Sequence, residues 1–227
     1  MNDAIYSVAI DGPGGAGKST IARKAAERLG FVYVDTGAIY RTVAYAVDKF
    51  KVDADCVQAV ADLLPQLCIC LSWDNDGVQH MHLNGSDVTN YIRTPEIAQL
   101  TSKISTLPAV RDFLMETQRE TARRHCVVMD GRDIGTVVLP NADVKIFLTA
   151  SPEVRARRRH LELQNKGADV SYEQVLSELQ ERDYRDSHRE VAPLKAAEDA
   201  LLLDTSDLDR EQSIAAVTEI IQRTLDL

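Results

Sequence analysis

The sequence is short of cysteine and of long apolar runs. Its four cysteines, Cys56, Cys68, Cys70 and Cys126, are scattered over 227 residues, which is not the pattern of a disulfide framework. No stretch approaches the roughly 20 apolar residues of a membrane-spanning helix. The N-terminal stretch MNDAIYSVAIDG also lacks the basic segment and long apolar core of a signal peptide. We therefore expect a soluble cytoplasmic protein without a membrane partner.

The sequence also lacks an excess of positive charge. It has 26 lysines and arginines against 35 aspartates and glutamates, and its net charge is −9. This balance disfavours a protein that coats DNA or an anionic membrane, so we expect no nucleic acid polymer as a partner. A local basic cleft is compatible with the same sum, so the placement of the arginines carries more information than their number. With 44% hydrophobic residues, the chain is long enough for one sizeable domain with a small insert.

Short apolar runs alternate with helical patterns along the chain. The runs that predict buried strands are 6–11, 31–35, 126–130, 144–150 and 200–206. Helices are predicted near 18–29, after Asp35 and from near Asp209 toward the end of the chain. This alternation predicts a parallel sheet that is covered by helices on both faces. Carboxylates at the strand ends favour a ligand crevice at that edge, and they are Asp11, Asp35, Asp130 and Asp204.

Residues 66–89 break this alternation. An Asp-Gly pair at 76–77 and an Asn-Gly pair at 84–85 separate short runs with partial period-2 character, which predicts a small antiparallel β insert. A zinc site across the hairpin is an alternative that the spacing does not favour, because its candidate ligands stand only two residues apart. Those candidates are Cys68, Cys70, His80 and His82.

The stretch GPGGAGKS, residues 12–19, fits the phosphate-binding pattern G-x-x-x-x-G-K-[ST]. It follows a predicted strand and opens a predicted helix. In that context, glycines let backbone N–H groups curl around phosphate oxygens, and the helix N-terminus adds partial positive charge. Lys18 would reach the β and γ phosphates, and the Ser19 hydroxyl would ligate Mg²⁺. The motif indicates a nucleoside triphosphate but leaves the reaction open.

A GTPase is not favoured. The stretch NKGAD at 165–169 superficially matches the guanine motif N-K-x-D, but Ala168 stands where that motif requires aspartate. The stretch also follows an arginine-rich helical pattern, whereas the guanine motif should follow a buried strand.

Arginines recur where loops should meet the strand ends. An arginine forms planar bidentate hydrogen bonds with phosphate and stays charged. A single arginine is most often a solvated surface residue, but this recurrence in an acidic protein predicts a second phosphate-binding site. The residues are Arg41, Arg132, Arg155, Arg157, Arg158, Arg159, Arg182, Arg185 and Arg189.

Together, the stretches GPGGAGKST, DTGAIYR, VMDGRDIGT, ERDYRDSHR and APLKAAEDALLLDTS make the sequence resemble the bacterial cytidylate kinases, which are P-loop nucleoside monophosphate kinases. The resemblance extends over nearly the whole chain. It implies an α/β fold, in which a five-stranded parallel sheet is flanked by helices and carries a small antiparallel β insert and a helical lid. It further implies a single, monomeric kinase unit over 1–227. In that unit the core is 1–62, 100–152 and 190–227, the monophosphate-binding insert is about 63–99, and the lid is about 153–189.

The resemblance implies that the protein phosphorylates CMP and dCMP with ATP and Mg²⁺ by direct in-line transfer. The implied ATP-binding residues are Gly12, Pro13, Gly14, Gly15, Ala16, Gly17, Lys18, Ser19, Thr20, Arg157 and Arg158, with Ser19 on the metal. The implied CMP-binding residues are Arg41, Arg132 and Arg189 at the phosphate, Ser102, Arg111 and Asp133 at the base, Arg182 and Asp186 at the sugar, and also Thr36, Tyr40, Asp130 and Gly131. Lys18, Arg132, Arg158 and Arg189 are the implied catalytic residues.

Three alternatives stay open. A P-loop kinase of a small-molecule alcohol would use Asp35 or Asp133 as a base, although an arginine-rich acceptor site argues for a phosphate acceptor. A non-enzymatic nucleotide sensor would bind ATP without turnover. An internal Asp–Arg ion pair that closes the loop would explain the stretch DGRD at 130–133 without a ligand.

Overall fold

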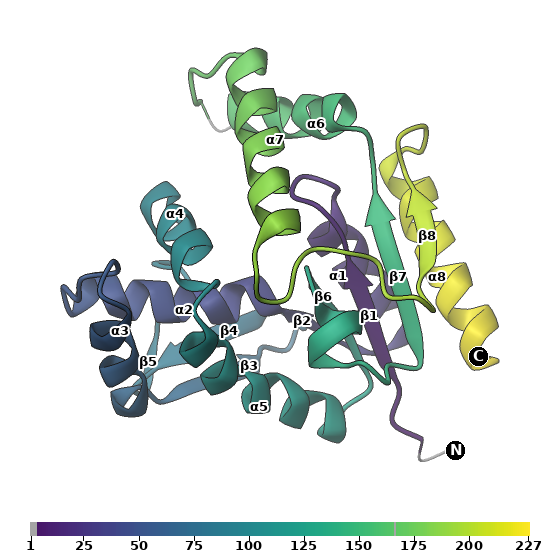
Figure 1. The fold of residues 1–227 in the computed structure, drawn as a ribbon. Helices are drawn as coiled ribbons and strands as arrows, with labels where there is room; N and C mark the ends of the chain where they lie inside the picture. The colour runs from purple at the N-terminus through teal and green to yellow at the C-terminus, as the bar shows by residue number, and fades with distance from the viewer. Residues whose placement is uncertain (1–3, 166) are drawn as a thin grey trace.

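The computed structural model describes residues 4–165 and 167–227. Its larger sheet has five parallel strands in the order β2-β6-β1-β7-β8 (Figure 1). The strands of this sheet are β1 (Ser7–Asp11), β2 (Val32–Asp35), β6 (Val127–Gly131), β7 (Val144–Thr149) and β8 (Leu201–Asp204). A smaller antiparallel sheet contains β3 (Ile69–Trp73), β4 (Gln79–Leu83) and β5 (Ser86–Asp87). The predicted parallel sheet and the predicted antiparallel insert are both confirmed.

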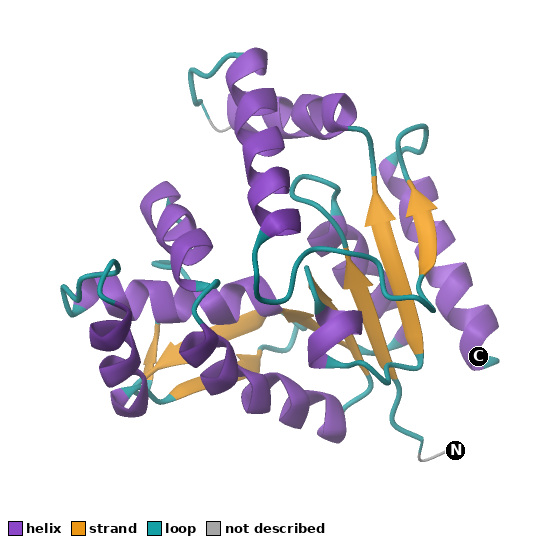
Figure 2. Ribbon diagram, viewed as in Figure 1, coloured by secondary structure: helices purple, strands orange, loops and turns teal. Residues whose placement is uncertain are grey.

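The helices connect these strands and cover them (Figure 2). They are α1 (Lys18–Leu29), α2 (Thr36–Lys49), α3 (Val57–Leu63), the short η1 (Leu64–Gln66), α4 (Pro95–Ile104), α5 (Pro108–Arg124), the short η2 (Ile134–Val138), α6 (Pro152–Asn165), α7 (Tyr172–His188) and α8 (Arg210–Leu225). Among the described residues, none of the helices combines the length and the apolar character that crossing a membrane requires.

The two faces of the larger sheet bury different helices because neighbouring residues of a strand point to opposite sides. Val128 on β6 packs in one cluster with residues of α1 and α8, such as Ile21 and Ile221. Its neighbour Met129 packs in the other cluster with α2, α5 and the insert. The sheet is therefore the middle layer of three, and its strand ends are left free at one edge for a site.

Local capping fixes where the site helices begin. The side chain of Asp35, the last residue of β2, accepts a hydrogen bond from the Ala38 N–H at 2.9 Å, so α2 starts directly at the strand end. An aspartate at this position satisfies a backbone donor that the helix itself leaves unpaired. The insert is fastened at the same place, since the Gln79 amide accepts from the Asp35 N–H and donates to the Asp35 carbonyl.

Helices α6 and α7 rise above the ends of the sheet strands, over the loop between β1 and α1 (Figure 1). They share a small apolar cluster of their own, which is built on Ala156, Val175 and Leu179. Ser171 and Gln174 form a capping box that starts α7. After α7, the chain crosses in front of the sheet to reach β8 at its edge.

Candidate active site

The loop that joins β1 to α1 has a backbone that only glycine can adopt at its first position. Gly12 has a φ of +148°, and a Cβ atom there would lie 2.0 Å from the carbonyl oxygen of Leu148. The loop ends at Lys18, the first residue of α1, which is buried and donates from Nζ to the Pro13 carbonyl at 2.7 Å. This strand–loop–helix arrangement, with a lysine at the helix start, suits phosphate.

Three cations converge on this loop. A Cβ atom on Gly14 would lie 3.6 Å from both Arg132 Nη2 and Arg182 Cδ. Burial and the charge of Arg132 hold the pKa of Lys18 well below its usual range, although Asp130 opposes the shift. The charge of Arg132, followed by burial, lowers the pKa of Arg182 to about 10. Because these cations repel one another, a polyanion that binds among them relieves a real electrostatic cost.

The carboxylate of Asp130 stands beside the hydroxyl that the motif assigns to a metal. Ser19 Oγ donates to Asp130 at 2.9 Å, and the Tyr33 hydroxyl donates to the other carboxylate oxygen at 2.7 Å. Burial and the nearby charge of Asp35 raise the pKa of Asp130. Within the described residues no group of three or more His, Cys, Asp or Glu side chains is arranged to hold a metal ion. A hydroxyl and a carboxylate fit Mg²⁺ that arrives on ATP, since this ion binds through few protein oxygens and takes the rest from phosphate and water.

Each arginine that the sequence places at the acceptor phosphate pairs with a carboxylate. Arg41 bonds to Asp35 at 2.8 Å, Arg132 bonds to Asp186 at 2.9 Å, and Arg189 lies 3.4 Å from Asp133. Arg41 also has a buried Nε atom that has no hydrogen-bond partner among the described residues. The arginines are thus pre-placed, and they keep donors that a phosphate could use.

Arg93 joins this group, although the sequence reasoning missed it. Its guanidinium lies 3.0 Å from Asp35, beside that of Arg41. It stands in the loop just before Thr94, which caps α4. A lone arginine in a polar loop gives no recognisable motif. The one feature of the sequence that could have pointed to Arg93 is its position between the β insert and the next predicted core segment, where the chain returns toward the strand ends.

Two of the three residues implied for the base, Arg111 and Asp133, are in contact. Arg111 of α5 and Asp133 form a buried ion pair, with side chains that are 4% and 7% exposed. The guanidinium of Arg111 lies over the ring of Tyr40, 5.8 Å from its centroid. Ser102 lies on α4 and is half-buried. The Asp–Arg ion pair internal to residues 130–133 that the sequence left open is not the pairing found, because Asp133 pairs with Arg111 of α5 and Arg132 pairs with Asp186 of α7.

Thr36 and Gly131, which are also implied for CMP, lie together at this edge of the sheet. The Thr36 hydroxyl donates to the Asp130 carbonyl at 2.7 Å. A Cβ atom on Gly131 would come within 2.6 Å of Ile134 Cδ1 and 3.0 Å of Thr36 Oγ1, so the chain has no room for a larger residue there.

The four arginines of α6 separate into different environments. Arg155 is buried, donates to the carbonyls of Gly14 and Ala150, and pairs with Asp183 at 2.7 Å. Arg158 donates to the Thr205 carbonyl at 2.6 Å. Arg157 is exposed, and Arg159 pairs with Glu162 on the helix surface. Arg155 therefore ties α6 and α7 to the phosphate-binding loop, a structural role that the sequence did not assign to it.

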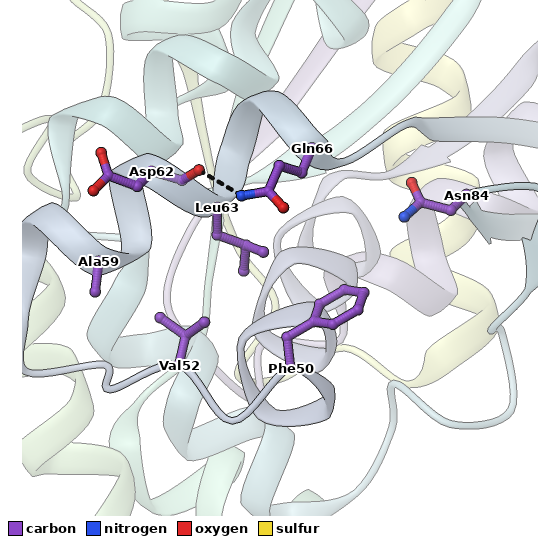
Figure 3. A pocket seen from close by; sticks show the side chains of 7 residues that line it. All are labelled: Phe50, Val52, Ala59, Asp62, Leu63, Gln66 and Asn84. Carbon is purple, nitrogen blue, oxygen red and sulfur yellow. Dashed lines mark hydrogen bonds between the residues drawn. The ribbon is translucent and has the colours of Figure 1, made fainter.

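A surface cavity of about 420 Å³ lies elsewhere, between the end of α2, α3, η1 and the β4–β5 turn (Figure 3). It is lined by Phe50, Val52, Ala59, Asp62, Leu63, Gln66 and Asn84. This lining contains no cation, so it does not suit a nucleotide phosphate. The convergence of charge marks the site at the strand ends instead.

The chain is similar to known proteins over nearly its whole length. A family model described as Cytidylate kinase matches residues 8–223. The cytidylate kinase of Carboxydothermus hydrogenoformans is 50% identical over 220 residues, which cover 97% of this chain and 99% of that protein. The cytidylate kinase of Lactobacillus johnsonii is 47% identical over 219 residues, which cover 96% and 95%. The crystal structure of an uncharacterized protein from Eubacterium ventriosum matches with a TM-score of 0.51 at 12% identity, covering 97% of this chain and 98% of that one, and shows likeness of fold alone.

Proposed function

The chain belongs to the cytidylate kinase family, and from this premise we propose which of its residues carry the reaction. The protein is an enzyme that transfers a phosphoryl group from ATP to CMP and dCMP. Neither a kinase of small-molecule alcohols nor a nucleotide sensor is favoured by the family match. The observation that carries the assignment of residues is the convergence of Lys18, Arg132 and Arg182 on the phosphate-binding loop.

The donor nucleotide is held by residues 12–20. Backbone N–H groups of the loop and the N-terminus of α1 bind its phosphates. Lys18 neutralises charge on the transferring phosphoryl group. Ser19 and Asp130 would hold the Mg²⁺ that accompanies ATP, and this ion would supply charge neutralisation at the phosphates. Arg157 and Arg158 of α6 complete the ATP side.

The acceptor is held by the arginines at the opposite wall. Arg41, Arg132 and Arg189 bind the CMP phosphate, and Arg93 lies close enough to Arg41 to assist them. Arg182 and Asp186 lie near the sugar. Ser102, Arg111 and Asp133 face the base, alongside Thr36, Tyr40, Asp130 and Gly131. For substrate to bind, the arginines exchange carboxylate partners for phosphate oxygens of similar geometry.

No residue has to act as a general base. The acceptor oxygen of CMP is already anionic, so no proton has to be removed before transfer. Rate acceleration then comes from in-line positioning and from neutralising charge, with Lys18, Arg132, Arg158 and Arg189 as the catalytic residues.

We extend the proposal to the organisation of the chain. The segments at about 63–99 and 153–189 act as monophosphate-binding insert and lid around a core of 1–62, 100–152 and 190–227. Support comes from Gln79, which fastens the insert to Asp35, and from the separate apolar cluster of α6 and α7. We further propose that the enzyme works as a monomer in the cytoplasm.

Purified protein is expected to form CDP from CMP and dCDP from dCMP, and to require both ATP and Mg²⁺. The measurement couples ADP release to a spectrophotometric signal with CMP, dCMP, UMP, AMP and a panel of alcohols as acceptors, and identifies the products by chromatography. Folded protein that binds both nucleotides and forms no diphosphate would support a sensor. Turnover with an alcohol alone would support the other alternative.

Arg41→Ala and Arg132→Ala are expected to weaken CMP binding by at least about 10-fold, because each removes a charge-assisted bond to the monophosphate. Affinity for a non-hydrolysable ATP analogue should change by less than about 3-fold. Both variants should fold, because each leaves the carboxylate concerned with another arginine partner. Asp35 still pairs with Arg93, and Asp186 still lies 3.9 Å from Arg182. Calorimetric titration with each ligand separately tests the expectation, and Arg23→Ala on the exposed face of α1 is the matched control. Equal losses for both ligands would contradict the assignment.

A further inference from the structure

Asp11 is a buried carboxylate that the proposed reaction does not use. It is the last residue of β1 and directly precedes Gly12, the first residue of the phosphate-binding loop, and it is 5% exposed. Its two oxygens accept hydrogen bonds from the backbone N–H groups of Ile134 at 2.8 Å and Gly135 at 2.7 Å. Both donors lie in the first turn of η2.

This arrangement is energetically expensive. Burial raises the pKa of Asp11 to about 6, and the hydrogen bonds from Gly135 and Ile134 only partly oppose the shift. A buried charge of this kind costs free energy that a neutral side chain would avoid. However, a carboxylate provides two acceptor oxygens for two adjacent N–H donors, whereas the side-chain amide of asparagine provides one.

The turn that Asp11 holds carries residues of the acceptor site. Arg132 and Asp133 immediately precede Ile134 in the chain. In the sheet, Asp11 lies in register with Gly131, where the packing of Ile134 leaves no space for a side chain. The path from the ATP loop to the acceptor loop is therefore short. It runs from Gly12 through Asp11 and two hydrogen bonds to Ile134 and Gly135, directly after Asp133.

The opposite end of η2 has a clamp of its own. Arg119 of α5 donates from Nε to the Val138 carbonyl at 2.9 Å and from Nη2 to the Val137 carbonyl at 3.0 Å. A carboxylate at the N-terminal end and a guanidinium at the C-terminal end both complement the backbone groups that they meet. Asp11 directly precedes the phosphate-binding loop, whereas Arg119 belongs to α5, so the two clamps can be separated by experiment.

We propose that Asp11 is a positioning residue that sets the distance between the donor-binding loop and the acceptor-binding residues Arg132 and Asp133. The inference rests on the proposed function, because it concerns the alignment of the two substrates for in-line transfer. Transfer demands near-attack geometry, and a misplacement of about 1 Å can cost roughly 10²-fold in rate. Asp11 therefore acts on kcat through alignment and contributes little to the affinity for either nucleotide alone.

Asp11→Asn tests this directly. The amide keeps one acceptor oxygen but turns its NH₂ group toward the second N–H donor, so the turn must shift. We expect kcat to fall by about 10- to 100-fold, while separate dissociation constants for CMP and for an ATP analogue stay within about 3-fold of wild type. The melting temperature should fall little compared with the loss of kcat, because the variant also removes a buried charge. Arg119→Ala, the matched control, should keep kcat within about 3-fold.

The outcomes separate the inference from the proposed function. Wild-type protein that forms CDP, together with an Asp11→Asn variant of normal kcat, overturns the positioning role and leaves the proposed function intact. Equal losses of kcat in Asp11→Asn and Arg119→Ala, each with a lowered melting temperature, also overturn it, because they would show a purely structural clamp. If Asp11→Asn does not fold, Asp11→Glu replaces it. Glutamate keeps both oxygens but displaces them by one methylene, so normal kcat in Asp11→Glu would overturn the proposal as well.

Discussion

Lys18→Met is expected to lower kcat by at least roughly 10²- to 10³-fold, the range seen when a group aimed at developing charge is removed. Lys18 is the cation at the start of α1, and we propose that it neutralises charge on the transferring phosphoryl group. Methionine has a similar length and fills the same space without charge. Single-turnover measurement of CDP formation at saturating ATP and CMP isolates the effect on the chemical step.

The same variant should be at least as stable as the wild type. Burial and Arg132 depress the pKa of Lys18, so the charged form is disfavoured in the folded protein relative to the unfolded chain. Removing the charge removes that cost, which offsets the loss of the hydrogen bond from Nζ to the Pro13 carbonyl. Lys24→Met, on the exposed side of α1, is the matched control and should leave both turnover and thermal stability unchanged. A Lys18→Met protein with near-normal turnover would show that another group holds the catalytic role.

The fold could be predicted because its signals are local. Each buried strand is a short apolar run that needs no knowledge of its partners, and β1 and β6 pair in the sheet although more than a hundred residues separate them. The phosphate-binding loop was equally accessible, since its glycines, Lys18 and Ser19 occur in one contiguous stretch. The resemblance to cytidylate kinases supplied the acceptor residues, which no periodicity could have revealed.

The pairings within the site could not be predicted in this way. Asp35 binds Arg41 from its own helix and Arg93 from the far end of the insert, and Gln79 bonds to the Asp35 backbone from a third segment. Such contacts depend on how the insert docks, and docking is decided by packing between elements. Arg155 is the clearest example. Its sequence context suggested a lid arginine, but its buried contacts connect α6 to Asp183 of α7 and to the Gly14 carbonyl of the phosphate-binding loop.

The four carboxylates at the strand ends share a position in the sequence pattern but differ in what they bind. All were expected to face one crevice, yet each has its own task. Asp11 holds the turn of η2, Asp35 caps α2 and pairs with arginines, Asp130 accepts from Ser19, and Asp204 accepts from the Ser206 N–H and hydroxyl. Position at a strand end predicts that a carboxylate is placed near the site, and only the neighbours decide what it does.

Asp133→Asn is expected to remove most of the preference for CMP over UMP. Cytosine offers an amino donor at C4 where uracil offers a carbonyl, and an ionised carboxylate can only accept. The carboxylate of Asp133 therefore suits cytosine and opposes uracil, and Arg111, a donor only, suits the acceptors at N3 or O2 of cytosine. Asparagine can turn its NH₂ group toward the uracil carbonyl. Discrimination by buried hydrogen bonds can reach roughly 10⁴-fold, and a partly open site gives less, so we expect the ratio of kcat/KM values to fall by at least about 10²-fold.

The amide variant is preferable to Asp133→Ala because of the ion pair that the structure shows. Alanine would leave Arg111 buried without its partner and would cost about 3–5 kcal/mol of stability. Asparagine still offers its one carbonyl oxygen to the buried Arg111, and only the longer contact of Arg189, 3.4 Å from the other carboxylate oxygen, loses its acceptor. Asp112→Asn, one residue beyond Arg111 on the exposed side of α5, controls for charge and handling. Steady-state kinetics with CMP and UMP at one fixed ATP concentration give the ratio. If both acceptors lose kcat/KM in equal proportion, Asp133 serves to hold the two arginines in place and does not read the base.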